Sequence, residues 1–184
     1  MHAVVADAKV HMQKAVDATK REFASVRTGR ASPVLLERVT VDYYGVPTPV
    51  TQVANVSVPE ARLLVIQPWD KALIKEIERA IQKSELGLTP STDGAVIRLP
   101  IPPLTGDRRR ELVKVVHKQA EDGRVAIRNI RRDHRERLER SERAGDLSKD
   151  EARRHQDELQ KITDQHIKEI DTLLAAKEKE ITEV

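Results

Sequence analysis

The spacing of apolar residues changes from helical to alternating and back again along this chain, and that change limits how it can fold. Apolar residues recur every three or four positions in residues 3–27, in residues 107–144 and from residue 148 onward, which predicts three amphipathic helices. Residues 31–105 hold short alternating runs separated by Gly and Pro, which predict strands and turns. No helix can bury its apolar side alone. The sequence therefore predicts an α+β fold, a three-helix bundle with a small β/α/β domain inserted between the first two helices.

The predicted boundaries place residues 1–29 and 106–184 in the bundle and residues 31–105 in the inserted domain. Two connections, 29–33 and 102–106, join these parts, and both are rich in Gly and Pro. Paired connections restrict motion more than one flexible tether does, so we expect a hinge in an elongated, bent molecule. The predicted hinge residues are Arg30, Ala31, Ser32, Pro33, Pro102, Pro103, Leu104, Thr105 and Gly106.

The bundle helices carry recognisable end signals. Gly29 is expected to cap the first helix, and Ser148 with Glu151 fits a capping box that opens the third. Gly123 lies inside the second helix, where it costs about 1 kcal/mol relative to Ala and permits a bend. The expected buried stripe of the third helix is Ala152, His155, Leu159, Ile162, His166, Ile170, Leu173 and Ile181.

The inserted domain is predicted to contain strands at 35–44, 50–58, 61–67 and around 97–101. A short helix should begin after Asp70, which can cap it, and run to residue 86, with Gly87 as its stop. Trp69 is expected to pack against the core of this domain. We expect one of the two rings of Tyr43 and Tyr44 to pack as well.

Residues 124–135 hold five arginines against a single acid, Asp133. Four of these arginines recur at helical spacing, roughly a quarter turn from an apolar stripe that begins at Ile127 and ends at Leu138. Nearby acids are too few to pair with them all, and a planar guanidinium grips two phosphate oxygens at once. The stripe consists of Arg124, Arg128, Arg131 and Arg135, with Arg132 beside it and Arg110 on its upstream extension.

The uneven charge of the chain supports an anionic partner. Residues 106–144 carry 13 basic against 8 acidic groups, whereas residues 145–184 carry 7 against 11. Aromatic residues make up only 2%, which disfavours stacking on single strands. Folded, double-helical RNA, contacted through its shape and phosphates, fits better than DNA.

The sequence offers little for catalysis. It has no cysteine, no glycine-rich phosphate loop and no H-E-x-x-H motif, so we expect no enzyme, no metal and no cofactor. His134, His155 and His166 are expected to pack near the bundle core. No segment has the length and apolarity of a membrane span or a signal peptide, which favours a cytoplasmic protein, and a closed bundle favours a monomer.

Several blocks resemble those of the bacterial ribosome recycling factor family, in order and across essentially the whole chain. Two departures are Gly106-Asp107, where the family commonly has two acids, and Gly123, which replaces a more helix-favouring residue. The matching blocks are RTGRASP (27–33), DYYG (42–45), Asp70, IERAI (77–81), LGL (86–88), Pro90, PPLT (102–105), RRR (108–110) and RVAIRNIRRD (124–133).

The resemblance implies a bent two-domain molecule with roughly the outline of a transfer RNA. It implies that the bundle lies on ribosomal RNA of the large subunit and that elongation factor G, with GTP, pushes on the inserted domain and hinge to split the post-termination ribosome. The family's key arginine corresponds to Arg131, and Arg128, Arg109, Arg27 and Arg30 also fall on matching positions. A protein-binding helical adaptor is the alternative function, and an enzyme comes third.

Overall fold

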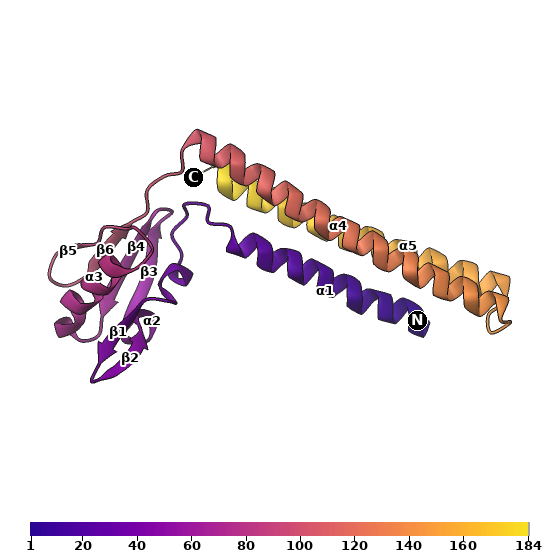
Figure 1. Cartoon of the computed structure of the whole chain (residues 1–184), viewed down its shortest axis with the longest axis horizontal. Coiled ribbons are helices and arrows are strands. Elements are labelled where there is room, and N and C mark those ends of the chain that lie inside the picture. The colour runs from indigo at the N-terminus through magenta and orange to yellow at the C-terminus, as the bar shows by residue number, and fades with distance from the viewer. Residues whose placement is uncertain (184) are drawn as a thin grey trace. The chain divides into compact units, whose positions relative to one another are not determined.

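The computed structural model describes residues 1–183, which form two compact units (Figure 1). The helical unit comprises residues 1–27 and 106–183, and the inserted unit comprises residues 28–105. The α+β prediction of a long helical bundle and a small β-containing domain is confirmed. No helix within residues 1–183 has both the length and the apolarity needed to cross a bilayer.

Three long helices build the helical unit: α1 (Ala3–Ser25), α4 (Gly106–Arg143) and α5 (Lys149–Thr182). Each helix contacts the other two. Their buried residues recur at helical spacing, as three apolar stripes that face a common core must. In α5 the stripe passes through Leu174 rather than Leu173, and His155 is only half-buried.

The helix ends differ in how well their signals worked. The Ser148 hydroxyl accepts a hydrogen bond from the Glu151 amide while the Glu151 carboxylate accepts one from the Ser148 amide, so the predicted capping box is confirmed. The first helix, however, ends at Ser25 with Val26 as its cap, and Gly29 lies beyond it. Gly29 instead adopts a φ of +76° in the connection that follows.

Gly123 lies where α4 is in close contact with both α1 and α5, and α4 runs through it without interruption. A Cβ at this position would lie 2.4 Å from the Thr19 Oγ1 of α1 and 2.9 Å from the Ile170 Cδ1 of α5. Those separations are too short for real atoms. The missing side chain therefore lets α1 and α5 approach α4, which offsets the lower helix propensity of glycine.

The inserted unit contains a four-stranded antiparallel sheet in the order β3-β4-β6-β5 and a separate β1-β2 hairpin. Two 3₁₀ turns, Pro33–Leu36 and Lys71–Leu73, complete it. The strands and helices are β1 (Thr40–Tyr43), β2 (Val46–Pro49), α2 (Val50–Val53), β3 (Ala54–Glu60), β4 (Leu63–Pro68), α3 (Ile74–Lys83), β5 (Ser91–Thr92) and β6 (Ile97–Pro100).

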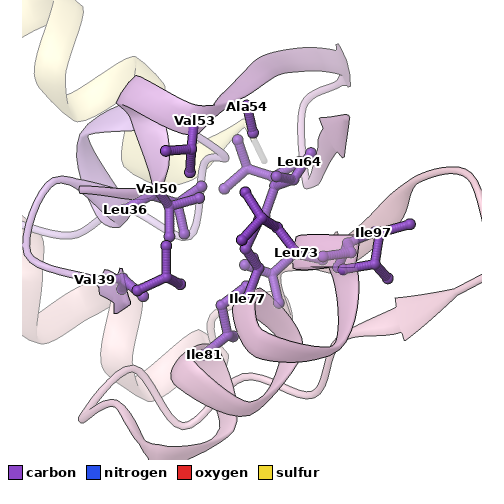
Figure 2. Close-up of a cluster of buried hydrophobic side chains, with 14 of the residues drawn as sticks. Leu36, Val39, Val50, Val53, Ala54, Leu64, Leu73, Ile77, Ile81 and Ile97 are labelled. Atoms are coloured by element: carbon purple, nitrogen blue, oxygen red, sulfur yellow. The ribbon is translucent and has the colours of Figure 1, made fainter. Parts of the chain in front are cut away.

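An aliphatic core joins these elements (Figure 2). Ile77 and Ile81 of α3 lie on the side that faces the sheet, together with Leu64 of β4 and Ile97 of β6. All four are fully buried. Because α3 presents one apolar stripe and the sheet one apolar face, the two periods of the sequence meet in a single core.

Several predictions within the inserted unit were wrong in detail. Strands were expected at 35–44 and 50–58, but residues 35 and 36 belong to a 3₁₀ turn that begins at Pro33, and residues 50–53 form a short helix. Asp70 caps the turn before α3 as predicted, but α3 ends at Lys83 rather than near residue 86.

The aromatic residues of this unit are less buried than predicted. Trp69 is 72% exposed, so the expectation that it packs in the core was wrong. Tyr43 and Tyr44 are both exposed and contact each other edge to face, with ring centroids 4.7 Å apart. Aliphatic side chains fill the core of this unit, which leaves the rings outside.

Candidate nucleic-acid interface

The arginine stripe lies on α4, which packs along α5 for much of its length (Figure 1). Ile127, His134 and Leu138 are buried against the bundle, and Ile130 is half-buried. The arginines lie beside this buried stripe, at the boundary between the core and the solvent. Their positions along α4 follow the sequence prediction, but their surroundings differ from one end of the stripe to the other.

At its N-terminal end the stripe is neutralised by carboxylates. Arg124 hydrogen-bonds to Asp171 of α5 (Nε to Oδ1, 2.8 Å) and to Glu121 (Nη1 to Oε2, 3.0 Å), and its side chain is only 19% exposed. Arg128 donates to the other oxygen of Glu121 at 3.0 Å. The count of acids within residues 124–135 therefore missed the partners of these two arginines, because α5 and the preceding turn of α4 supply them.

This pairing shifts the ionisation of the groups involved. Hydrogen bonds from Arg124 and then from Arg128 hold the pKa of Glu121 below its ordinary value. Partial burial acts to lower the pKa of Arg124, but the bonds to Asp171 and Glu121 outweigh it, so that pKa lies above its usual range. The charges at this end are internally compensated.

Toward its C-terminal end the stripe is held differently. The Arg131 Nη1 donates to the amide oxygen of Gln160 on α5 at 3.3 Å, and the Gln160 Nε2 donates to the Asp164 carboxylate at 2.8 Å. No carboxylate in residues 1–183 lies within 4.0 Å of Arg131. A neutral amide thus orients the guanidinium and leaves its charge uncompensated at close range.

A cavity of about 290 Å³ lies beside this guanidinium. Arg131 and Arg135 line it from α4, and Gln156, Asp157, Leu159 and Gln160 line it from α5. Arg135 also donates to Glu139 at 3.1 Å. Arg132 is 67% exposed, and its nearest carboxylate oxygen, on Asp133, is 3.9 Å away. This end therefore combines exposed cationic groups with a polar recess that is lined by guanidinium and amide groups and by the Asp157 carboxylate.

The remaining predicted RNA-binding arginines are spread over both units. Arg110 is exposed and bonds to Asp107, while Arg109 is half-buried. Arg27 is exposed at the edge of the helical unit, and Arg30 is exposed in the inserted unit. The stripe arginines are thus gathered on one helix, whereas Arg30 belongs to the other unit.

The two predicted hinge connections contact each other where they enter the inserted unit. A Cβ placed on Gly29 would lie 3.2 Å from the Leu104 Cγ and 3.7 Å from the Pro102 carbonyl oxygen. The Ala31 amide donates to the Ala61 carbonyl and the Ile101 amide to the Arg62 carbonyl, both at 2.8 Å. Ser32 caps the turn that contains Pro33. Hydrogen bonds therefore anchor both connections to the same loop of the inserted unit.

A cluster of Asp7, His11 and His134 was not anticipated from the sequence. His134 is buried in the bundle as predicted, but its Nε2 lies 2.9 Å from the Asp7 Oδ2. Hydrogen bonds from Arg137 and then from His134 lower the pKa of Asp7 to about 2. The i, i+4 spacing of Asp7 and His11 was a local signal, but the contact with α4 spans 127 residues and carries no such signal.

Comparison with known proteins gives consistent results. The sequence model of the family described as Ribosome recycling factor matches residues 19–182. A ribosome-recycling factor of Geobacillus kaustophilus (strain HTA426) is 61% identical over 181 residues, and one of Desulforamulus reducens (strain ATCC BAA-1160 / DSM 100696 / MI-1) is 59% identical. In each case the match covers 98% of this chain and 98% of the relative.

Solved structures agree in fold. The solution structure of a ribosome recycling factor matches with a TM-score of 0.73 at 46% identity, covering 98% of this chain and 96% of that one. A second match, with a TM-score of 0.63 and 46% identity, covers 97% of this chain and 96% of the other. It comes from models for the T. thermophilus ribosome recycling factor and the E. coli elongation factor G bound to the E. coli post-termination complex.

Proposed function

This chain belongs to the ribosome recycling factor family, and on that premise we propose that it splits the bacterial post-termination ribosome into its subunits together with elongation factor G and GTP. The relative found with elongation factor G on a post-termination complex supports both partners. A protein that acts on the ribosome would be located in the cytoplasm. In this proposal the protein acts mechanically and catalyses no covalent step.

The observation that carries the RNA-binding part of this proposal is the state of Arg131. Its guanidinium is oriented by the neutral Gln160 amide, and no neighbouring carboxylate within residues 1–183 compensates its charge. An arginine that is oriented in advance and not neutralised loses little entropy when it binds phosphate and need not first break an ion pair. Arg131 and Arg132, with Arg135 beside them, would therefore form the main contact with ribosomal RNA of the large subunit.

The other arginines would have smaller roles. Arg128 is half exposed and shares Glu121 with Arg124, so it can reach RNA if that carboxylate is released. Arg124 would chiefly hold α4 against α5 through Asp171. Arg27, Arg30, Arg109 and Arg110 would extend the basic surface beyond the stripe.

The mechanical part of the proposal depends on the two connections. Both are hydrogen-bonded to the inserted unit at residues 31 and 101, so bending would concentrate between those anchors and the helices, in 26–30 and 102–106. Paired short connections allow a swing with few degrees of freedom. Elongation factor G would push the inserted unit about this hinge, and the bundle bound to RNA would transmit the force.

A subunit-splitting assay tests the proposal. Post-termination ribosomes are mixed with the protein, with and without elongation factor G and GTP, and subunit release is followed by light scattering. Release should require all three components. Splitting that proceeds without this chain, or that persists unchanged in an Arg131→Ala variant at moderate salt, would contradict it.

Salt and nuclease separate RNA docking from a protein-binding adaptor. Neutralising phosphates releases counterions, so ribosome affinity should fall steeply as salt increases. In a pull-down with this chain as bait, the partner should be lost after nuclease treatment. A flat salt response, or a partner that is retained after nuclease, would instead favour the adaptor.

A further inference from the structure

Asp7 and His11 of α1 and His134 of α4 bring three potential metal ligands together, away from the arginine stripe. One carboxylate oxygen and one ring nitrogen of each histidine lie within 4.8 Å of one another. Asp7 and His11 are one helical turn apart, which places both on one side of α1. His134 reaches them from α4, so the ligands come from two helices.

His134 is already oriented as a metal ligand. Its side chain is 8% exposed, and its Nδ1–H donates to the Ile130 carbonyl at 2.7 Å. That bond directs Nε2 toward the Asp7 carboxylate, 2.9 Å away, to which the Nε2–H donates. Binding a metal through Nε2 would release this proton to solvent. Histidines that bind metals are oriented in this way, with one ring nitrogen donating to a carbonyl or carboxylate and the other facing the ion.

The other two ligands can adjust. The His11 Nδ1 lies 3.4 Å from the Asp7 Oδ1 and 2.9 Å from the Asp7 carbonyl oxygen. The ring is half exposed, and to bind an ion it would give up this hydrogen bond and rotate. A tetrahedral site with bonds of about 2.0 Å needs ligand atoms about 3.3 Å apart. The present separations of up to 4.8 Å therefore require a small rotation of one exposed ring rather than a movement of the helices.

Arg137 is the competitor for this site. Its Nη1 donates to the Asp7 Oδ2 at 2.6 Å, so a cation already occupies part of the carboxylate. The Arg137 side chain is half exposed and can turn toward solvent. A dication that binds both histidines as well as Asp7 gains two ligands that the guanidinium cannot use.

We propose that Asp7, His11 and His134 bind one Zn²⁺ ion, with water in the fourth position, and that the ion cross-links α1 to α4. Two imidazoles and one carboxylate suit zinc, whereas calcium and magnesium need more oxygen ligands. Zinc bound to the folded chain alone raises the stability of the helical unit. This inference does not depend on the proposed recycling function.

The test uses the full chain without an affinity tag. Titration with ZnCl₂ in a calorimeter should give one site per chain, and Co²⁺ should give the visible absorption of a tetrahedral complex. The melting temperature should rise with Zn²⁺. Absence of a saturable site, or the spectrum of octahedral Co²⁺, would overturn the proposal.

Variants distinguish this site from other histidines. His11→Ala should weaken zinc binding at least tenfold, since it removes a ligand at an exposed position and leaves the core intact. His117→Ala and His2→Ala are the controls. His117 faces Glu178, and the His2 ring lies 4.7 Å from that of His155, so each tests another possible binding place. Loss of binding in either control, with retention in His11→Ala, would overturn the assignment.

Arg137→Ala should change zinc affinity in the opposite direction. Removal of the competing guanidinium should tighten zinc binding at least threefold while it slightly lowers the melting temperature of the metal-free protein. A variant that merely disturbed the structure would lower both the zinc affinity and the melting temperature. Unchanged or weaker zinc affinity in Arg137→Ala would contradict the direct competition on which the proposal rests.

Discussion

The two ends of the arginine stripe have similar sequences but different surroundings. Arg124 is bound to Asp171 and Glu121 and is largely covered, whereas Arg131 meets Gln160, whose amide is in turn held by Asp164. The Arg124–Asp171 and Arg131–Gln160 contacts cross from α4 to α5. A carboxylate partner links the helices and compensates the charge of the guanidinium. An amide partner orients the guanidinium but leaves its charge uncompensated. The same residue type thus stabilises the bundle at one end and remains available for a partner at the other.

Disturbing the helix contact beside the paired end should have the largest effect. Gly123→Ala would place a Cβ against Thr19 and Ile170 and should lower the free energy of unfolding by about 2 kcal/mol, despite the higher helix propensity of Ala. Urea denaturation measures this change. Thr19→Ala removes the hydroxyl that the new Cβ would meet, so the double variant should recover part of the loss. A fully additive double variant would refute the close contact.

Comparing alanine substitutions of Arg131 and Arg124 is the next test. Arg131→Ala should weaken binding to post-termination ribosomes about tenfold and leave the unfolding free energy nearly unchanged. Arg124→Ala should show the reverse, with stability reduced by about 1 kcal/mol and affinity reduced less than threefold. Fluorescence anisotropy at fixed salt and urea denaturation measure the two quantities. Equal effects of both substitutions on affinity would abolish the distinction between the ends.

Giving Arg131 a carboxylate neighbour should have a smaller effect. Gln160→Glu replaces the amide next to Arg131 with a carboxylate of nearly the same shape and removes the hydrogen bond that the amide donates to Asp164. Ribosome affinity should fall about threefold to fivefold because the new carboxylate competes with phosphate for the guanidinium. Gln165→Glu makes the same charge change at an exposed position of α5 and serves as the control. If both variants lose affinity equally, overall charge rather than the local contact is responsible.

The pH dependence of stability should show the smallest effect. The ordinary pKa of a glutamate is 4.5, and the pKa of Glu121 lies below it. The pairing of Glu121 therefore stabilises the folded state fully above the ordinary pKa. This contribution is lost as the pH falls through the lowered pKa of the folded state. Glu121→Gln should therefore reduce the decline in stability between about pH 5 and pH 3. Thermal melting across that range measures it, and an identical pH profile in wild type and variant would contradict the assignment.

The bundle was more predictable from sequence than the inserted unit. Long helices repeat one apolar period over many residues, so their number and approximate ends follow from local spacing. Short elements give fewer repeats, and residues 50–53, with valines only at positions 50 and 53, are too few to define a helical period until the neighbouring elements are known. Trp69 illustrates the same limit, since its exposure depends on whether the aliphatic side chains already fill the core.

The candidate site divides in the same way. Spacing along α4 placed the arginines in one stripe, because helical geometry is local. The choice of a carboxylate for Arg124 and an amide for Arg131 depends on which residues of α5 lie opposite them, 47 and 29 positions away. The contact between Asp7 and His134 likewise depends on the packing of α1 against α4.

The sequence by itself determined the fold class, the line of arginines and the capping box of α5, because each follows from residue periodicity or from groups a few positions apart. Tertiary structure alone decided which arginines face a carboxylate and which an amide, why a glycine is needed at position 123 and which histidine meets Asp7. The physical reason is that charge compensation and close packing are set by the residues that face each other across helices, and helix packing brings together positions that the chain keeps far apart.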